Sequence, residues 1–130
     1  MEEVQKFLKD CGIYFLATVD GNVPRVRPFG TAEIFENHLY IQTGKKKDVY
    51  KQIQKNNNVE LCANNEGKWI RIAGKLLVDD RIEAKRDMLN KNPNLRSMYD
   101  ENDENTTVLY FESGIATISS FTDEPKIIKF

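Results

Sequence analysis

Two short basic stretches are the parts of this sequence best suited to binding an anion. Lys45, Lys46 and Lys47 follow Gly44 at the expected start of a helix. A helix N-terminus carries partial positive charge, so each lysine there costs roughly 0.3–1 kcal/mol unless an anion is bound. Free backbone N–H groups, the helix dipole and the lysines would together form a phosphate site. A solvated, salt-screened lysine-rich turn is the alternative, and this segment alone does not decide between them.

The second stretch contains Arg25 and Arg27 between two prolines. Their i, i+2 spacing places both side chains on one face of a β-strand. The guanidinium fork suits phosphate or carboxylate, and two neighbouring arginines repel each other unless they are solvated or share an anion. A solvent-facing edge strand explains this stretch equally well when it is taken alone. Both stretches together favour anion binding, because neighbouring strands would bring them to one rim of a barrel.

The pattern around these stretches predicts mainly β-structure. Asp20-Gly21 predicts a hairpin turn, and Pro24 and Pro28 predict that the returning strand is an edge or bulged strand. The strands are expected at residues 13–19, 23–35, 39–43, 59–63, 69–78 and 108–121, the last being one strand or a pair broken near Ser113-Gly114. Helices are expected at residues 4–11, 45–53, 80–89 and 93–99. Six or so strands with these helices predict a small antiparallel barrel, a single domain over residues 1–130.

Composition excludes several classes of function. Lys and Arg number 19 against 20 Asp and Glu, a balance that argues against a dedicated nucleic-acid binder. We find no signal peptide and no apolar run long enough to cross a membrane, which leads us to expect a cytoplasmic protein. Cys11 and Cys62 are far apart and are expected to be small core residues rather than zinc ligands. His38 is the only histidine and falls in a predicted turn, which excludes any mechanism that needs two.

The order and spacing of several weak motifs resemble the pyridoxamine 5'-phosphate oxidase-related flavoproteins. The segments that carry the resemblance are residues 17–29 around Asp20-Gly21 and Pro24-Arg25-Val26-Arg27, residues 39–44 (Leu-Tyr-Ile-Gln-Thr-Gly), and Lys46-Lys47. Residues 58–61 and 69–74 follow at suitable spacing, and the resemblance extends from the first helix to Phe121. It implies a six-stranded antiparallel split β-barrel, mainly β with flanking helices, that works as a homodimer. FMN would lie in a groove between the protomers.

The resemblance also implies which residues hold the cofactor. Arg27 matches the position that meets the FMN phosphate, with Arg25 as its neighbour and alternative. Lys47 matches the phosphate-binding lysine, with Lys46 as its neighbour and alternative. The flavin ring would lie beside Val26, Pro28 and Phe29 and would touch Gln42 and Thr43. Trp69 and Arg71 would reach the flavin from the partner chain, with dimer or core packing as the alternative for Trp69.

The sequence departs from the named oxidases at its C-terminal end. Residues 123–130 contain no histidine, although the family's pyridoxal-binding segment carries arginine and histidine. The chain therefore resembles the short, reductase-like members, including those similar to nitroimidazole resistance proteins. We expect an FMN-dependent oxidoreductase of unspecified substrate, with NADH or NADPH as electron donor although no dinucleotide-binding glycine motif is present. The alternatives are an FMN carrier or sensor, a haem-binding barrel, or a barrel that has lost its cofactor.

Overall fold

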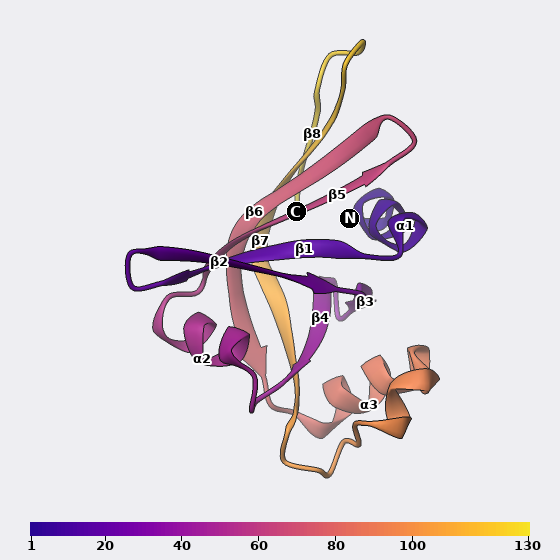
Figure 1. The fold of residues 1–130 in the computed structure, drawn as a ribbon. Coiled ribbons are helices and arrows are strands. Elements are labelled where there is room, and N and C mark those ends of the chain that lie inside the picture. Colours follow the sequence, from indigo (N-terminus) through magenta and orange to yellow (C-terminus); the bar gives the residue numbers. More distant parts are fainter.

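Residues 1–130 form one twisted antiparallel sheet flanked by helices in the computed structural model (Figure 1). The strand order is β2-β1-β5-β6-β7-β4-β3, with β8 paired to β7. The eight strands are β1 (Tyr14–Asp20), β2 (Val23–Phe29), β3 (Glu33–Phe35), β4 (His38–Gly44), β5 (Asn58–Asn65), β6 (Lys68–Asp79), β7 (Thr106–Ser120) and β8 (Lys126–Lys129). The helices are α1 (Glu2–Cys11), α2 (Asp48–Lys55), α3 (Ile82–Lys91) and the short 3-10 helix η1 (Pro93–Ser97). The mainly β, antiparallel architecture is confirmed, and the short β3 and β8 bring the strand count above six.

The first hairpin forms where the Asp20-Gly21 pair predicts it. Gly21 has a φ of 64°, which glycine adopts without steric cost. β2 pairs with β1 alone and is therefore an edge strand, in agreement with Pro24 and Pro28. The expected single strand over residues 23–35 is wrong, because β2 ends at Phe29 and Glu33–Phe35 form a separate strand that pairs with β4.

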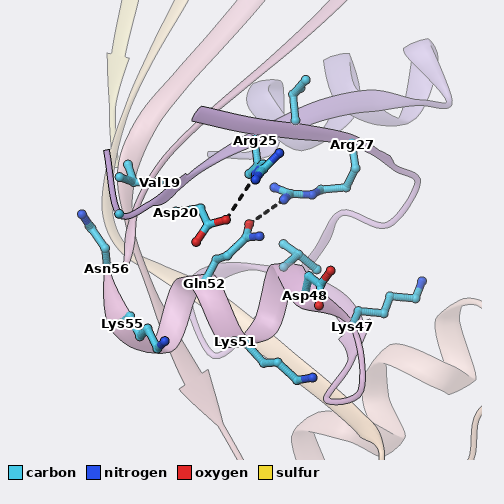
Figure 2. Close-up of a pocket in the computed structure, with 13 residues that line it drawn as sticks. Val19, Asp20, Arg25, Arg27, Lys47, Asp48, Lys51, Gln52, Lys55 and Asn56 are labelled. Atoms are coloured by element: carbon cyan, nitrogen blue, oxygen red, sulfur yellow. Dashed lines mark hydrogen bonds and ion pairs between the residues drawn. The ribbon is translucent and has the colours of Figure 1, made fainter. Parts of the chain in front are cut away.

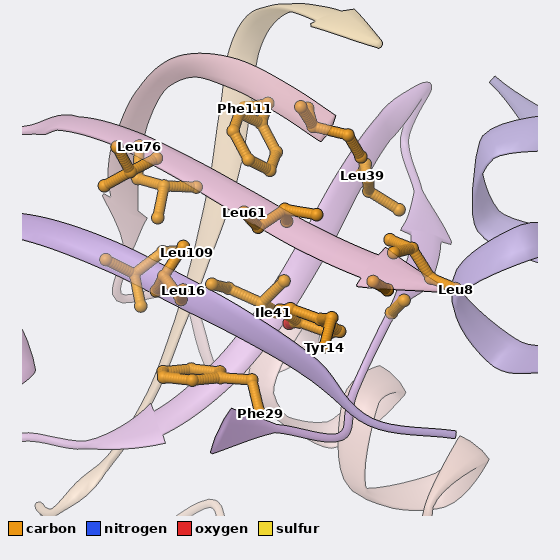
Figure 3. Packing of buried hydrophobic residues seen from close by; sticks show 14 of the residues in the cluster. Leu8, Tyr14, Leu16, Phe29, Leu39, Ile41, Leu61, Leu76, Leu109 and Phe111 are labelled. Carbon is orange, nitrogen blue, oxygen red and sulfur yellow. The ribbon is translucent and has the colours of Figure 1, made fainter. Parts of the chain in front are cut away.

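The hydrophobic core lies inside the curved sheet (Figure 3). Alternate residues of β1 point inward, so Tyr14 and Leu16 are buried while Phe15 is 51% exposed. The buried Tyr14 hydroxyl donates a hydrogen bond of 2.7 Å to the carbonyl oxygen of Thr31, which satisfies it on the chain segment just after β2. The far end of β2 is thereby attached to the core, and α1 packs its apolar stripe against β3 and β5.

β6 and β7 are the longest strands and form the centre of the sheet. Their register shifts between Gly74 and Leu76. A Cβ atom on Gly74 would meet the carbonyl oxygen of Ser113 at 2.6 Å, so the approach of the two strands requires glycine there. β7 continues without a break past Ser113-Gly114. Of the two alternatives that the sequence allowed, one long strand or two shorter ones, the structure therefore has the single strand.

Both cysteines are free thiols. Cys11 is partly buried against the core at the end of α1. Cys62 is exposed, so its expected place in the core is wrong. The buried positions of β5 are Val59, Leu61 and Ala63, and the alternation of the strand turns Cys62 to the outer face.

The helices α2 and α3 border the site. α2 packs on β1 through Val49 and Ile53, while α3 covers parts of β3, β4 and β7 and continues into η1 (Figure 1). β2 and the end of β4 lie beside both of these helical segments. No helix of the structure is long and apolar enough to span a membrane.

Candidate functional site

Arg27 extends from β2 towards α2 and is held there by three neighbours (Figure 2). Its Nη1 donates to the carbonyl oxygen of Leu16 at 3.1 Å and to the hydroxyl of Thr18 at 2.7 Å. Its Nη2 donates to Oε1 of Gln52 at 2.7 Å, and the Thr18 hydroxyl donates to the same oxygen at 2.6 Å. The guanidinium is therefore fixed by neutral groups from β1 and α2 and forms no ion pair.

Burial lowers the pKa of the Arg27 guanidinium from its ordinary value, and the nearby charge of Arg25 lowers it further, while Asp48 opposes the change. A cation that is partly withdrawn from water and has no carboxylate partner is stabilised by a bound anion. Arg25 differs in this respect: it is exposed and its Nε donates to Asp20 at 3.2 Å. Of the two arginines, Arg27 is the one whose charge is uncompensated.

The helix after the three lysines begins later than predicted. α2 starts at Asp48, Lys47 is its N-cap in an extended conformation, and the lysines lie in the preceding turn rather than in the first helical turn. The backbone oxygen of Asn105 accepts from the N–H of Lys45 at 2.7 Å, and its Oδ1 accepts from the N–H of Lys46 at 3.1 Å. These two N–H groups are occupied. In the first turn of α2 the N–H of Tyr50 donates to the carbonyl oxygen of Lys47 at 3.2 Å, while those of Asp48 and Val49 have no intrahelical partner and no side-chain cap.

The side chains of the three lysines diverge. Lys45 forms an ion pair of 3.1 Å with Asp80. Lys46 is exposed and lines neither of the hollows described below, whereas Lys47 lines both. Lys47 is therefore the member of this stretch that lies at the site.

The first hollow lies between the β1–β2 hairpin and α2 and has a volume of about 920 Å³ (Figure 2). Five cationic and two acidic side chains line it, and one of the acids, Asp20, is engaged by Arg25. Its lining residues are Val19, Asp20, Gly21, Arg25, Val26, Arg27, Lys47, Asp48, Val49, Lys51, Gln52, Lys55 and Asn56. The hollow is therefore an electropositive surface suited to phosphate.

The second hollow, about 430 Å³, lies between β2, the end of β4 and the helical segment around η1. It shares Arg27, Lys47 and Val49 with the first hollow, so the two adjoin at the arginine and the lysine. Its other lining residues are Pro28, Phe29, Gly30, Thr31, Gln42, Thr43, Asn92, Asn94, Leu95, Met98 and Tyr99. Its volume is within the range of small-molecule sites, and amides with apolar groups replace the charges of the first hollow.

Eight of the predicted site residues line one or both hollows: Arg25, Val26, Arg27, Pro28, Phe29, Gln42, Thr43 and Lys47. Lys46, Trp69 and Arg71 do not. Trp69 packs on Phe121 with 5.1 Å between ring centroids, and Arg71 is exposed on the outer face of β6. A contribution of these two from a partner chain stays a prediction.

Several lining residues were not among the predicted ones. Asp48, Lys51, Gln52 and Lys55 have i, i+3, i+4 and i+7 spacing on α2, the polar complement of the buried Val49 and Ile53. That polar stripe was visible in the sequence and could have identified them. Asn94, Leu95, Met98 and Tyr99 reach the second hollow from η1 and the residues after it, and no sequence signal connects them with β2.

A separate group of charged residues lies near the start of β4 and the end of β6. The Tyr40 hydroxyl donates to Asp79 at 2.7 Å, and Arg81 binds both Asp79 and Glu36. Hydrogen bonds from Arg81 and Tyr40 lower the pKa of Asp79 to about 2, although burial opposes this shift. His38 packs on Tyr110 and is not among the lining residues of either hollow. No cluster of three or more His, Cys, Asp or Glu suited to a metal ion is present.

Comparisons with known proteins agree with this geometry. The family model for pyridoxamine 5'-phosphate oxidase matches residues 1–109. A crystal structure of a NimC/NimA family protein from Clostridium acetobutylicum is 40% identical with a TM-score of 0.97 and covers 100% of this chain and 92% of that chain. No curated protein matches the sequence.

Two more distant structures show the same fold. One is a pyridoxamine 5'-phosphate oxidase-related, FMN binding protein from Nostoc punctiforme, 18% identical with a TM-score of 0.65, covering 98% of this chain and 91% of that chain. The other is a heme binding protein from Mycobacterium smegmatis, 12% identical with a TM-score of 0.72, covering 98% of this chain and 56% of that chain. The fold is thus the split β-barrel, and the chain belongs to the pyridoxamine 5'-phosphate oxidase family.

Proposed function

We propose that this protein binds FMN, with the phosphate between Arg27 and Lys47. The observation that carries the proposal is the uncompensated, partly buried Arg27 guanidinium at the junction of the two hollows, next to Lys47 and the uncapped start of α2. Cations and free N–H groups converging on one point are the usual means of holding a phosphate. The FMN binding protein of Nostoc punctiforme, which has the same fold, supports the choice of ligand.

The flavin ring would occupy the second hollow. Pro28 and Phe29 supply an apolar wall there, and Gln42 and Thr43 supply polar groups at the end of β4. When bound, FMN supplies the hydride or electron transfer itself. Apart from Arg27, Lys47 and Tyr99 the lining contains no titratable side chain, so the chain's own part is to hold the cofactor, shape the site and keep water out.

From this we propose a flavin-dependent oxidoreductase with NADH or NADPH as electron donor. The similarity to a NimC/NimA family protein at 40% identity supports a short family member rather than a pyridoxamine 5'-phosphate oxidase in the strict sense. The physiological substrate stays unassigned. A cytoplasmic location completes the proposal and agrees with the two free thiols.

We also propose that two chains associate through the outer face of the sheet. Val26, Ala17 and Glu60 are paired in register on β2, β1 and β5, and Ala73 and Ile115 continue the row on β6 and β7. Val26 is 66% and Ile115 49% exposed, although both are large apolar residues. Large exposed apolar residues on one face of a sheet favour a protein interface there.

The same outer face carries the residues expected to act across a dimer. A neighbouring row pairs Phe15 with Cys62, Cys62 with Arg71, and Arg71 with Thr117. Trp69 lies two positions from Arg71 and so on the same face. Ile115→Glu would place a charge in the interface; we expect it to yield monomers in light-scattering chromatography, and an unchanged mass would contradict this interface.

Haem is the second candidate, because the heme binding protein of Mycobacterium smegmatis has the same fold. Neither hollow is lined by histidine or cysteine, and the second hollow is lined by the thioether of Met98 and the phenol of Tyr99. Histidine and cysteine are the commonest axial ligands of haem, so the lining favours FMN. A Soret band from the purified protein would reverse that preference.

Quenching of FMN fluorescence tests the proposal. Apoprotein should quench and bind FMN, and the double variant Arg27→Ala/Lys47→Ala should bind it several kcal/mol more weakly, since charge-assisted hydrogen bonds contribute roughly 1.5–3 kcal/mol each. NADPH or NADH should then bleach the bound flavin under anaerobic conditions. Bound flavin that neither nucleotide reduces would favour a carrier or sensor. Equal affinity of the variant and the native protein would contradict the phosphate site.

A further inference from the structure

The first hollow contains more cationic side chains than one phosphate requires. Lys51 and Lys55 lie on α2 one and two turns beyond Lys47, on the same face of the helix, and both line the hollow (Figure 2). Lys47 and Arg27 suffice to meet the FMN phosphate at the junction. The remaining two lysines point to a second anionic group.

No carboxylate within ion-pair distance neutralises these two lysines. Neither Lys51 nor Lys55 forms an ion pair, and of the two carboxylates of the hollow, Asp20 already accepts from Arg25. Asp48 lies at the first position of α2, where the helix dipole favours it. Like charges four residues apart on one helix face repel, so an anion bound beside Lys47, Lys51 and Lys55 would relieve their repulsion. Asp48, three residues before Lys51, offsets part of this repulsion, and Lys55 lies in the last turn of α2, where the helix dipole favours a cation.

The remaining space is sufficient for a second ligand group. With the FMN ring in the second hollow and its phosphate at the junction near Arg27 and Lys47, the part of the first hollow beside Lys51 and Lys55 is left for a second group. Its other walls offer the amide of Asn56 and apolar surface from Val19. Phosphate-binding cations beside amides and apolar groups match the phosphates, ribose and base of a nucleotide.

We propose that Lys51 and Lys55 form a second phosphate subsite that binds the diphosphate of a nucleotide. This inference rests on the proposed function, because the FMN phosphate must occupy the junction of the two hollows between Arg27 and Lys47. The diphosphate has two sources: a separate nucleotide such as the NADPH electron donor, or the adenylate half of FAD if the protein accepts that longer flavin. Both have the same recognition chemistry, and the experiment below separates them.

Calorimetric titration of the FMN-loaded protein with ADP tests the subsite. ADP carries the diphosphate but cannot reduce the flavin, so the readout is binding alone. We expect ADP to bind the native protein and the variant Lys51→Gln/Lys55→Gln to bind it about tenfold more weakly, the upper range for two exposed ion pairs. Lys51→Arg/Lys55→Arg should retain the affinity because it keeps both charges. Lys6→Gln/Lys85→Gln, with the same loss of charge away from both hollows, should retain it too.

A second arm compares FAD with FMN on apoprotein. If FAD binds more tightly than FMN, and the advantage disappears in Lys51→Gln/Lys55→Gln, the subsite serves the cofactor's own second phosphate; ADP binding to FMN-loaded protein assigns it to a separate nucleotide. Two results would overturn the proposal. One is that ADP binds the native protein and the glutamine variant with equal affinity. The other is that ADP does not bind at all and the protein shows no preference for FAD that depends on the two lysines. The FMN titration of the same preparations reports separately on the proposed function.

Discussion

Replacing Arg27 by alanine should weaken FMN binding far more than the same change at Arg25. Arg27 is partly buried, its fork is already oriented by Thr18 and Gln52, and no carboxylate competes for it. Loss of one or two charge-assisted hydrogen bonds to phosphate corresponds to about 2–3 kcal/mol, a rise in Kd of roughly 30- to 150-fold. The Kd of the Arg27→Lys variant for FMN should lie between those of the native protein and Arg27→Ala, because lysine keeps the charge but lacks the guanidinium fork.

Arg25→Ala is the matched control for this prediction. Arg25 has i, i+2 spacing from Arg27 on the same strand and lines the same hollow, yet it is exposed and paired with Asp20. An exposed charge of this kind contributes about 0–1 kcal/mol, so the Kd should rise less than about fivefold. Quenching of FMN fluorescence by apoprotein gives both constants, and thermal unfolding checks that the variants fold. A larger loss in Arg25→Ala than in Arg27→Ala would refute the assignment of the phosphate to Arg27.

Three further predictions follow from particular contacts. Lys47→Ala should raise the Kd for FMN about tenfold or more, whereas Lys46→Ala should change it by less than about twofold, because the Lys46 side chain lines neither hollow. The pKa of Asp79 is lowered to about 2 in the folded protein. The ionised carboxylate therefore stabilises the fold fully above its unfolded pKa near 4, and this stabilisation is lost as the pH falls through about 2. Asp79→Asn should therefore cost about 2 kcal/mol in urea unfolding at pH 7, with the difference from the native protein shrinking towards pH 2; a gap independent of pH would contradict this. Gly74→Ala should destabilise the protein by about 1–3 kcal/mol, because its Cβ would lie 2.6 Å from the carbonyl oxygen of Ser113; unchanged unfolding would show that β6 and β7 can separate there.

Local sequence patterns predict most of the sheet. Asp20-Gly21 marks the hairpin, and Pro24 and Pro28 identify β2 as the edge strand, because these residues act through their own backbone geometry. Strand alternation, which is also a local rule, explains why Arg25 and Arg27 line one hollow. Side chains two residues apart on a strand point to the same face.

Contacts between distant segments decide the features that were not predicted. α2 begins at Asp48 rather than at residue 45 as predicted. The N–H groups of Lys45 and Lys46 are bound instead by Asn105, about sixty residues away in sequence. Gln52 positions Arg27 across α2 and β2, and no local pattern connects those two residues. Of the site residues that the family resemblance implies, Arg27 and Lys47 lie together at the junction of the two hollows, and Pro28, Phe29, Gln42 and Thr43 line the second hollow. Trp69 and Arg71 line neither hollow, and their contact with the flavin from a partner chain stays a prediction.

A crystal structure of the protein with bound FMN would test the central claim most directly. The account predicts phosphate oxygens at about 2.7–3.2 Å from the guanidinium nitrogens of Arg27 and from Nζ of Lys47, with the ring in the second hollow beside Phe29. FMN bound with its phosphate away from Arg27 and Lys47, or with its ring outside the second hollow, would contradict the account.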